Sequence, residues 1–79
     1  MVNSKDEQAL LRSLGKRLRK RREALGLSRQ AVAEAAGLNY DYLGSVERGE
    51  RNVAIINLAR LAEVLECSDV GELLDGVSL

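Results

Sequence analysis

The sequence predicts an all-α domain in which five short helices form one compact bundle. Its 79 residues include no proline, only two aromatic residues, Tyr40 and Tyr42, and many leucines and alanines. Apolar residues recur at intervals of three and four, and glycines and cap-forming polar residues separate the segments. We expect a single domain over residues 1–79, whose core supplies only about 3–5 kcal/mol, so a partner subunit would add stability.

The first helix is expected to follow an irregular terminus at residues 1–5 and to end at Leu25. Gly26 then stands where a left-handed C-terminal cap is needed. Arg21 and Arg22 interrupt the apolar stripe of this helix one turn after Leu18. The stripe consists of Leu11, Leu14, Leu18 and Leu25.

Residues 28–49, SRQAVAEAAGLNYDYLGSVERG, predict two short helices joined by a glycine turn. Ser28 and Asn39 are suited to cap the N-termini of these helices, and Gly37 and Gly49 to end them. Small residues in the first helix of the pair allow the second to approach closely. The side chains expected to face inward are Val32, Ala33, Ala36, Leu38, Leu43 and Val46.

Two further helices are expected after a loop at residues 50–53. The fourth helix carries an amphipathic stripe, and a short fifth helix is capped by Ser68 and stopped by Gly76. The fourth helix presents Ile55, Leu58, Leu61, Ala62 and Leu65, and the fifth holds Val70, Leu73 and Leu74.

The formal charge of zero conceals a strong separation of charge along the chain. Residues 12–29 contain eight basic residues and one acidic residue, a net charge of +7. Residues 61–79 contain five acidic residues and no basic one, a net charge of −5. Because binding to a polyanion depends on the local field, a neutral total does not exclude nucleic acid, and the acidic end should face away from it.

A compact pair of helices beside a basic segment is typical of a protein that places one helix in DNA. The major groove is about 12 Å wide and admits one helix, whose first-turn side chains reach base edges. Tyr40 and Asp41 occupy the first turn of the third helix, and Ser45 lies one turn further along the same side. The alternative is that Tyr40 and Asp41 are solvated residues at a helix start, with Asp41 favoured by the helix dipole.

Other classes of function have little support in the sequence. There is no histidine, and the one cysteine, Cys67, lies among apolar residues, as a buried thiol would. No nucleophile–base pair, metal cluster or phosphate loop is visible, and no apolar run approaches the roughly 18 residues that span a bilayer. We expect no enzymatic activity, cofactor, metal, small-molecule ligand or membrane insertion, and a cytoplasmic location, at the nucleoid when DNA is bound.

The segment SRQAVAEAAGLNYDYLGSVERG, preceded by LGKRLRKRREALGL, resembles the Cro/phage-repressor helix-turn-helix family over residues 14–74. This resemblance implies a lambda-repressor-like DNA-binding domain with the helix-turn-helix at the second and third helices. The block YLGSVERGERNVAI also resembles the small controller proteins of restriction–modification systems. Those proteins are dimers that regulate transcription of their own operon.

The resemblance also implies roles for individual residues. Arg22 and Glu47 match a partly buried ion pair that joins the first helix to the end of the recognition helix. Tyr42 has two interpretations, a phosphate donor at the rim or a half-buried residue whose hydroxyl reaches water. Only two or three basic residues of the run Lys16–Arg22 are expected to reach one duplex, since charge runs are usually solvated. The expected base-reading residues are Asn39, Tyr40, Asp41 and Ser45, and the expected DNA-backbone contacts are Lys16, Arg17, Ser28, Arg29, Tyr42, Arg48, Arg51 and Asn52.

Four positions depart from the family pattern. Arg29 stands where Gln is frequent, which would make that phosphate contact more ionic. Arg21 replaces a residue that is usually apolar, so packing near the first helix is expected to differ. Gly44 gives the recognition helix a position without a side chain, and Asp41 brings negative charge toward DNA.

The last two helices carry more apolar surface than one small core hides. Candidate dimer-interface residues are Ile56, Val64, Leu73 and Val77. A twofold dimer would place two recognition helices about one DNA turn apart on a palindromic operator. The sequence therefore predicts a sequence-specific, dimeric transcriptional regulator that binds double-stranded DNA. The alternative is a protein-interaction module of the antitoxin or coactivator-like type.

Overall fold

The computed structural model describes residues 4–74, and all regular elements in this range are helices. The all-α fold class and the order of five helices predicted from the sequence are confirmed. The bounds are α1 Ser4–Ala24, α2 Arg29–Ala36, α3 Tyr40–Glu47, α4 Ile55–Val64 and α5 Val70–Leu73.

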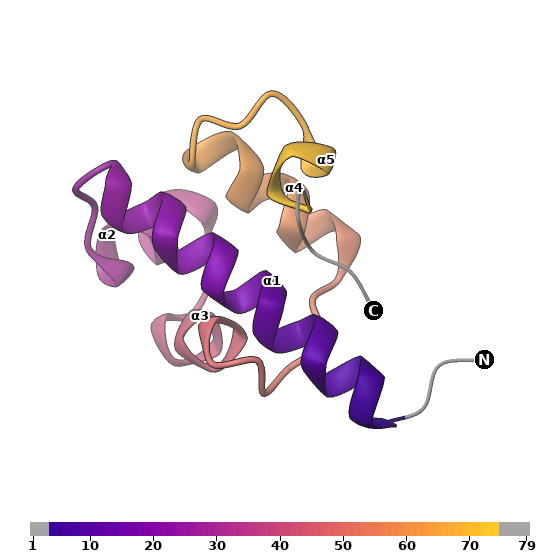
Figure 1. Ribbon diagram of the computed structural model, residues 1–79. Helices are drawn as coiled ribbons and strands as arrows, with labels where there is room; N and C mark the ends of the chain where they lie inside the picture. The colour runs from indigo at the N-terminus through magenta and orange to yellow at the C-terminus, as the bar shows by residue number, and fades with distance from the viewer. Residues whose placement is uncertain (1–3, 75–79) are drawn as a thin grey trace.

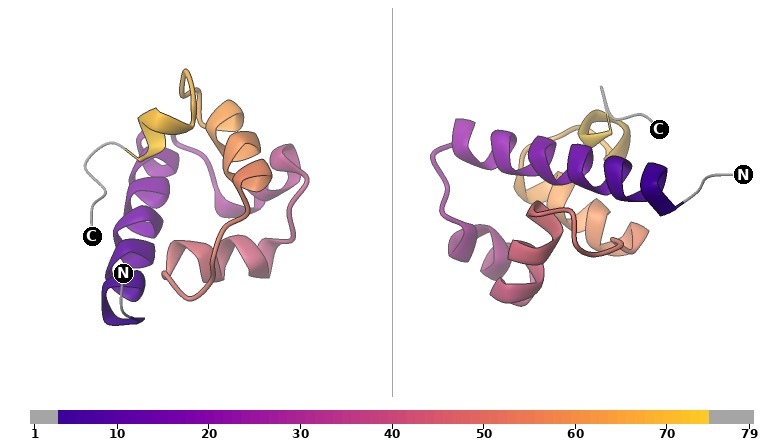
Figure 2. Two further views of the ribbon diagram at one scale, coloured as in Figure 1. Left: turned by 90° about the vertical axis from the view of Figure 1, so that its right-hand side faces the viewer. Right: turned by 60° about the horizontal axis from the view of Figure 1, so that its bottom comes forward.

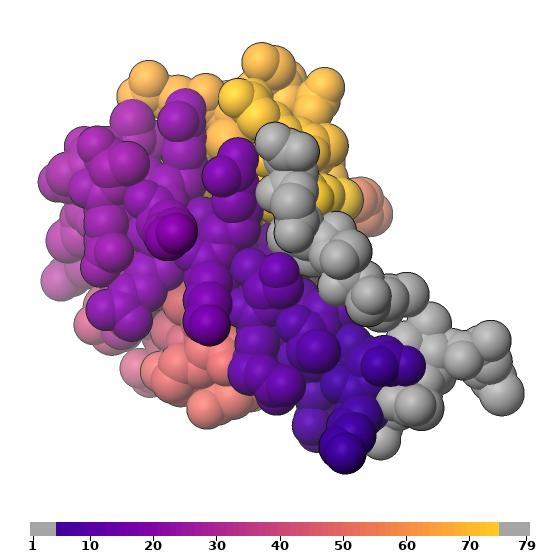
Figure 3. Space-filling model, in the orientation of Figure 1, coloured from indigo at the N-terminus to yellow at the C-terminus, as the bar shows by residue number. Residues whose placement is uncertain are grey.

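Helix α1 crosses the molecule diagonally, with α3 on one side and α5 on the other (Figure 1). Helix α2 packs against both α3 and α4, and the two views of Figure 2 show α4 closing the bundle beside α2. In the space-filling view, α1 separates the α3 region below from α5 above (Figure 3). The core comprises Leu14, Leu18, Val32, Ala33, Ala36, Leu43, Val46, Leu58, Leu61, Ala62, Leu65 and Leu73.

Some predicted element boundaries are wrong. Helix α1 already includes Ser4 and Lys5, which were expected to be irregular. Helix α5 is capped by Asp69, whose side chain accepts a hydrogen bond from the Glu72 N–H, instead of by Ser68. Ile55, expected to face inward, is 65% exposed in the first turn of α4. The expected stop at Gly76 lies outside the described residues.

The approach of α1 to α3 requires glycine at position 15. A Cβ atom there would lie 2.4 Å from the Glu47 carbonyl oxygen and 2.6 Å from that of Val46. Contacts this short are excluded by sterics, so only glycine permits this approach. The close contact fixes the C-terminal end of α3 against the middle of α1.

Two arginines of the basic run stabilise the opposite side of α1. Arg21 Nε donates to the Leu65 carbonyl at 2.9 Å and Nη2 to the Glu66 carbonyl at 3.1 Å. Arg17 Nη2 donates to the Glu72 carbonyl at 3.3 Å. The Arg21 guanidinium therefore satisfies carbonyls at the end of α4, where intrahelical donors are missing. This contact accounts for arginine at a position where an apolar residue was expected.

Candidate nucleic-acid interface

The turn between α2 and α3 is set by local hydrogen bonds. Gly37 ends α2 in the left-handed conformation, with φ of 69°. The Leu38 N–H then donates to the Ala33 carbonyl at 2.8 Å, and the Leu38 side chain packs against the core. Ser28 accepts from the Ala31 N–H at 3.0 Å, which caps α2 as predicted. This geometry holds the N-terminal ends of the two helices on one surface.

The start of α3 presents three of the predicted base-reading residues to solvent. Asn39 Oδ1 accepts from the N–H groups of Asp41 at 2.8 Å and Tyr42 at 3.1 Å, so its side chain is engaged as the helix cap. Tyr40 is 47% exposed, and Asp41 is also exposed. Among the described residues the Asp41 carboxylate has no hydrogen bond or ion pair. Asp41 and Tyr40 are therefore available to a ligand approaching the helix start.

Ser45 does not fit its predicted role as a base reader. Its side chain is buried, with 9% of the residue exposed. Its Oγ donates to the Tyr42 carbonyl at 2.7 Å, three residues earlier in the same helix. A short hydroxyl side chain in a helix commonly bonds back to its own backbone in this way. The expectation for Ser45 is corrected on these grounds.

A single buried carboxylate connects three helices below this surface. Glu47 Oε2 accepts from Arg22 Nε at 2.8 Å and its Oε1 from Arg22 Nη2 at 3.1 Å, the ion pair expected from the sequence. Arg29 Nε also donates to Glu47 Oε1, at 3.0 Å. The Glu47 side chain is only 2% exposed. The hydrogen bond to Glu47, opposed in part by burial, raises the pKa of Arg29 above its ordinary value.

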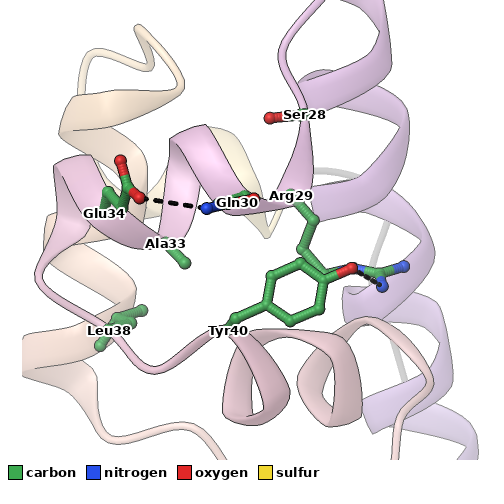
Figure 4. Close-up of a pocket in the computed structure, with 7 residues that line it drawn as sticks. All are labelled: Ser28, Arg29, Gln30, Ala33, Glu34, Leu38 and Tyr40. Atoms are coloured by element: carbon green, nitrogen blue, oxygen red, sulfur yellow. Dashed lines mark hydrogen bonds between the residues drawn. The ribbon is translucent and has the colours of Figure 1, made fainter.

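Arg29 also contacts Tyr40, a link that the sequence reasoning missed. Its Nη1 donates to the Tyr40 hydroxyl oxygen at 3.4 Å, and its guanidinium carbon lies 5.6 Å from the centroid of the ring (Figure 4). The two side chains border an open hollow of about 490 Å³ between α2 and α3, with an apolar lining from Ala33 and Leu38. The one sign of this contact in the sequence was that Arg29 stands where the family frequently has Gln.

The loop after α3 brings more of the predicted backbone contacts together. Arg51 lies with its guanidinium carbon 5.9 Å from the ring centroid of Tyr42. The half-buried ring of Tyr42 packs against the core, and its hydroxyl accepts from Asn57 Nδ2 at 3.3 Å. The ring of Tyr42 is partly buried, as the second interpretation expects, and a phosphate contact by its hydroxyl stays a prediction. Arg48 is exposed and pairs with Glu50 at 3.1 Å, and Asn52 is exposed.

The two candidates from α1 are not brought to this surface together. Arg17 donates to the Glu72 carbonyl beside α5, on the side of α1 away from α3 (Figure 1). We therefore remove Arg17 from the expected DNA-backbone contacts. Lys16 is exposed.

The four candidate interface residues have different environments. Ile56 is 64% exposed, whereas Val64 is half-buried against the core. Leu73 is 0% exposed, so its side chain is a core element and the prediction that it contacts a partner subunit is wrong. Val77 lies outside the described residues. Ile55 and Leu74, at 65% and 40% exposure, are apolar surface residues that the prediction omitted.

The chain belongs to the helix-turn-helix family of DNA-binding transcriptional regulators, because residues 18–70 match that family. It is 44% identical over 55 residues to the control protein C.SmaI of Serratia marcescens, a match that covers 70% of this chain and 66% of that protein. The crystal structure of the restriction–modification controller protein C.AhdI from Aeromonas hydrophila superposes with a TM-score of 0.77 at 44% identity, covering 80% of this chain and 94% of that one.

A helix-turn-helix transcriptional regulator from Vibrio cholerae has the same fold, with a TM-score of 0.80 at 28% identity, over 89% of this chain and 39% of that one. Within residues 4–74, no helix is long and apolar enough to cross a membrane. The resemblance to phage repressors and controllers deduced from the sequence is confirmed.

Proposed function

We propose that this regulator acts as a homodimer on a palindromic DNA operator, and that it is a controller of a restriction–modification system. The single observation that carries the proposal is the exposed start of α3, where Tyr40 and Asp41 are exposed and Tyr40 contacts Arg29 at the start of α2. The likeness to C.SmaI and C.AhdI supports the controller class. The protein would act in the cytoplasm, on the nucleoid.

In this proposal the contacts to DNA fall into two groups. Tyr40 and Asp41 read base edges in the major groove, and Asn39 adds a contact beside them while capping the helix. The remaining contacts position the protein on the phosphates without reading sequence. They are assigned to Ser28, Arg29, Tyr42, Arg48, Arg51 and Asn52, with Lys16 as a peripheral contributor.

Exposed isoleucines on α4 support a second subunit. Ile55 and Ile56 are neighbours and are 65% and 64% exposed. Adjacent exposed apolar side chains of this size are the kind of surface that a partner covers. A twofold partner would present a second recognition helix to the other half of a palindrome.

Selection of DNA from a random pool by the purified protein tests the proposal. We expect a shared half-site, present twice with a twofold relation, and a dissociation constant near or below about 10⁻⁸ M at physiological salt. Selection without any shared half-site would refute sequence-specific regulation and favour the protein-interaction module.

Sedimentation equilibrium of an Ile56→Asp variant tests the dimer. We expect the variant to be a monomer with unchanged helicity, because the substituted side chain is exposed in the single subunit. Wild-type protein that sediments as a monomer at all accessible concentrations, free and on DNA, would contradict the dimer.

A further inference from the structure

We propose that Arg29 is a positioning residue that holds Tyr40 as a hydrogen-bond donor toward an acceptor atom on a base. The chemical partner is a major-groove acceptor, namely purine N7, guanine O6 or thymine O4. This inference rests on the proposed function and refines it. It replaces the phosphate contact assigned to Arg29 under the proposed function with a role in sequence reading, and leaves the other assigned contacts unchanged.

The Arg29 side chain is held by the buried carboxylate of Glu47. Its Nε donates to Glu47 Oε1 at 3.0 Å, and Glu47 is itself held by Arg22 at 2.8 Å. The Glu47 side chain is 2% exposed and that of Arg29 27% exposed. A charge-assisted hydrogen bond to a buried, doubly held carboxylate fixes the Arg29 side chain more firmly than a solvated pair would.

Gly44 leaves space beside α3 for the Arg29 side chain. A Cβ atom at position 44 would lie 3.7 Å from both Cδ and Nη1 of Arg29. These distances are ordinary contacts, so Ala fits, but the atoms of a longer side chain would compete for the same space. A residue no larger than alanine at position 44 therefore leaves Arg29 room to extend from α2 to Glu47.

The contact with Arg29 determines where the proton of the Tyr40 hydroxyl can point. Arginine has five N–H donors and no acceptor, so at 3.4 Å the Tyr40 oxygen accepts from Arg29 Nη1. The hydroxyl proton is then directed elsewhere, and Tyr40 is 47% exposed. Figure 4 shows the ring crossing in front of the hollow with its oxygen at the guanidinium. The positive charge beside the oxygen favours donation by the hydroxyl over a second acceptance.

The experiment is a double-mutant cycle on the operator obtained by selection. Arg29→Met, Tyr40→Phe and the double variant are compared with wild type by fluorescence anisotropy. The DNA probes are the operator, unrelated duplex, and operators in which one base lacks one acceptor, such as 7-deazapurines for N7 and 2-aminopurine for guanine O6. Circular dichroism confirms that each variant is folded.

We expect wild type to lose roughly fivefold or more in affinity when the acceptor facing Tyr40 is deleted, in the range of a single mismatched base. Either single variant should remove this discrimination, and the double variant should lose no more than either single one. Arg29→Met should leave the salt dependence unchanged, because its charge already faces Glu47. Arg29→Lys keeps the positive charge but lacks the planar guanidinium that bonds Glu47 and Tyr40 together, so it should lose the discrimination too. This variant tests the proposal if Arg29→Met does not fold.

Arg51→Met is the matched control, because Arg51 is an exposed arginine of the loop. It should weaken binding to operator and unrelated DNA alike and lower the slope of log K against log salt by about 0.9 per subunit. The same uniform behaviour in Arg29→Met would overturn the proposal and make Arg29 a phosphate contact. Discrimination that depends on an exocyclic amino group, or effects that add in the double variant, would overturn it as well. A wild-type protein that selects no half-site would instead refute the proposed function.

Discussion

The two glycines that lie inside α1 and α3 illustrate how one residue type serves different ends. A Cβ at Gly15 would meet backbone carbonyl oxygens at 2.4 and 2.6 Å, which do not move unless the helices separate. A Cβ at Gly44 would meet Arg48 Nη1 at 3.2 Å, the far end of a flexible and exposed side chain. Gly15 is needed for packing, whereas Gly44 leaves room for Arg29.

We therefore predict opposite effects for the same substitution at these two positions. Gly15→Ala should destabilise the domain by about 1–3 kcal/mol, as overpacking does, and more if the helices cannot separate. Gly44→Ala should stabilise it by about 0.5–1 kcal/mol through helix propensity. Urea unfolding followed by circular dichroism measures both. A stable Gly15→Ala variant would show that α1 and α3 lie further apart than described.

The Glu47 carboxylate is shared by two arginines, Arg22 and Arg29. Removal of its charge by Glu47→Gln leaves two guanidinium groups without a counterion, one of them 10% exposed. We expect a loss of about 3–5 kcal/mol, enough to unfold much of a domain of this size. Arg22→Met should cost less, because Arg29 still neutralises the carboxylate. Thermal unfolding ranks the two variants, and a larger loss for Arg22→Met would contradict the shared role.

The caps at Ser28 and Asn39 were predictable from the sequence because a cap depends on residue type at a fixed spacing, and the pairing of Arg22 with Glu47 was implied by the family resemblance. Prediction from the sequence failed for Ser45, whose hydroxyl bonds to the Tyr42 carbonyl in its own helix. Helical spacing gives the side of a helix on which a residue lies. It does not predict whether a short polar side chain will bond to a ligand or to the backbone of its own helix.

Helix α5 is held at its start by polar contacts. It has four residues, and Glu72 accepts a hydrogen bond from the Ser68 N–H while Asp69 accepts from the Glu72 N–H. The Asp69 side chain satisfies one N–H group in the first turn of α5, and the Glu72 side chain satisfies the N–H of Ser68, the residue before the N-cap. The backbone hydrogen bond from Ser68 is the main cause that lowers the pKa of Glu72 below 4.5.

The lowered pKa predicts how this contact responds to pH. Because the carboxylate is preferred in the folded state, its contribution is complete above the ordinary pKa of 4.5 and is lost as pH falls through the lower folded value. Wild type should therefore exceed Glu72→Gln in urea midpoint at pH 7, and the difference should vanish in the acid range. Glu63→Gln, at an exposed position on α4, is the control and should show no such trend. A difference that persists at acid pH would contradict the role of the carboxylate.

The element order was predictable because glycines and cap residues mark the end of α1 and the bounds of α2 and α3, whereas α4 is marked by its apolar periodicity alone. The faces of α1 were less predictable, since basic residues occupy nearly all positions from Lys16 to Arg22. Arg17 and Arg21 turn to carbonyls of α5 and the end of α4, whereas Arg22 turns to α3. The partner of each arginine depends on where α4 and α5 end, and the periodicity of α1 carries no information about those positions.

Two connections at opposite ends of the described residues carry exposed charged side chains. The α4–α5 connection lies at the top of Figure 1 and of the left view of Figure 2, away from α3 at the bottom. Glu66 and Asp69 of that connection are exposed. The α3–α4 loop carries the exposed Arg48 and Arg51 at the other end. A zero total charge is therefore compatible with a surface that attracts phosphates.

This separation predicts that the location of a charge, rather than the total, governs DNA affinity. Arg51→Gln and Glu66→Gln each change the net charge by one, in opposite directions. Arg51→Gln should lower the slope of log K against log salt by about 0.9 per subunit, because one phosphate is no longer neutralised. Glu66→Gln should leave the slope unchanged, since charges further from DNA than about 8 Å are largely screened at physiological salt. Anisotropy titrations between low and physiological salt measure both slopes. If the two variants changed the slope by equal and opposite amounts, the total charge of the protein would govern its affinity for DNA. The acidic end would then have to lie close to the duplex.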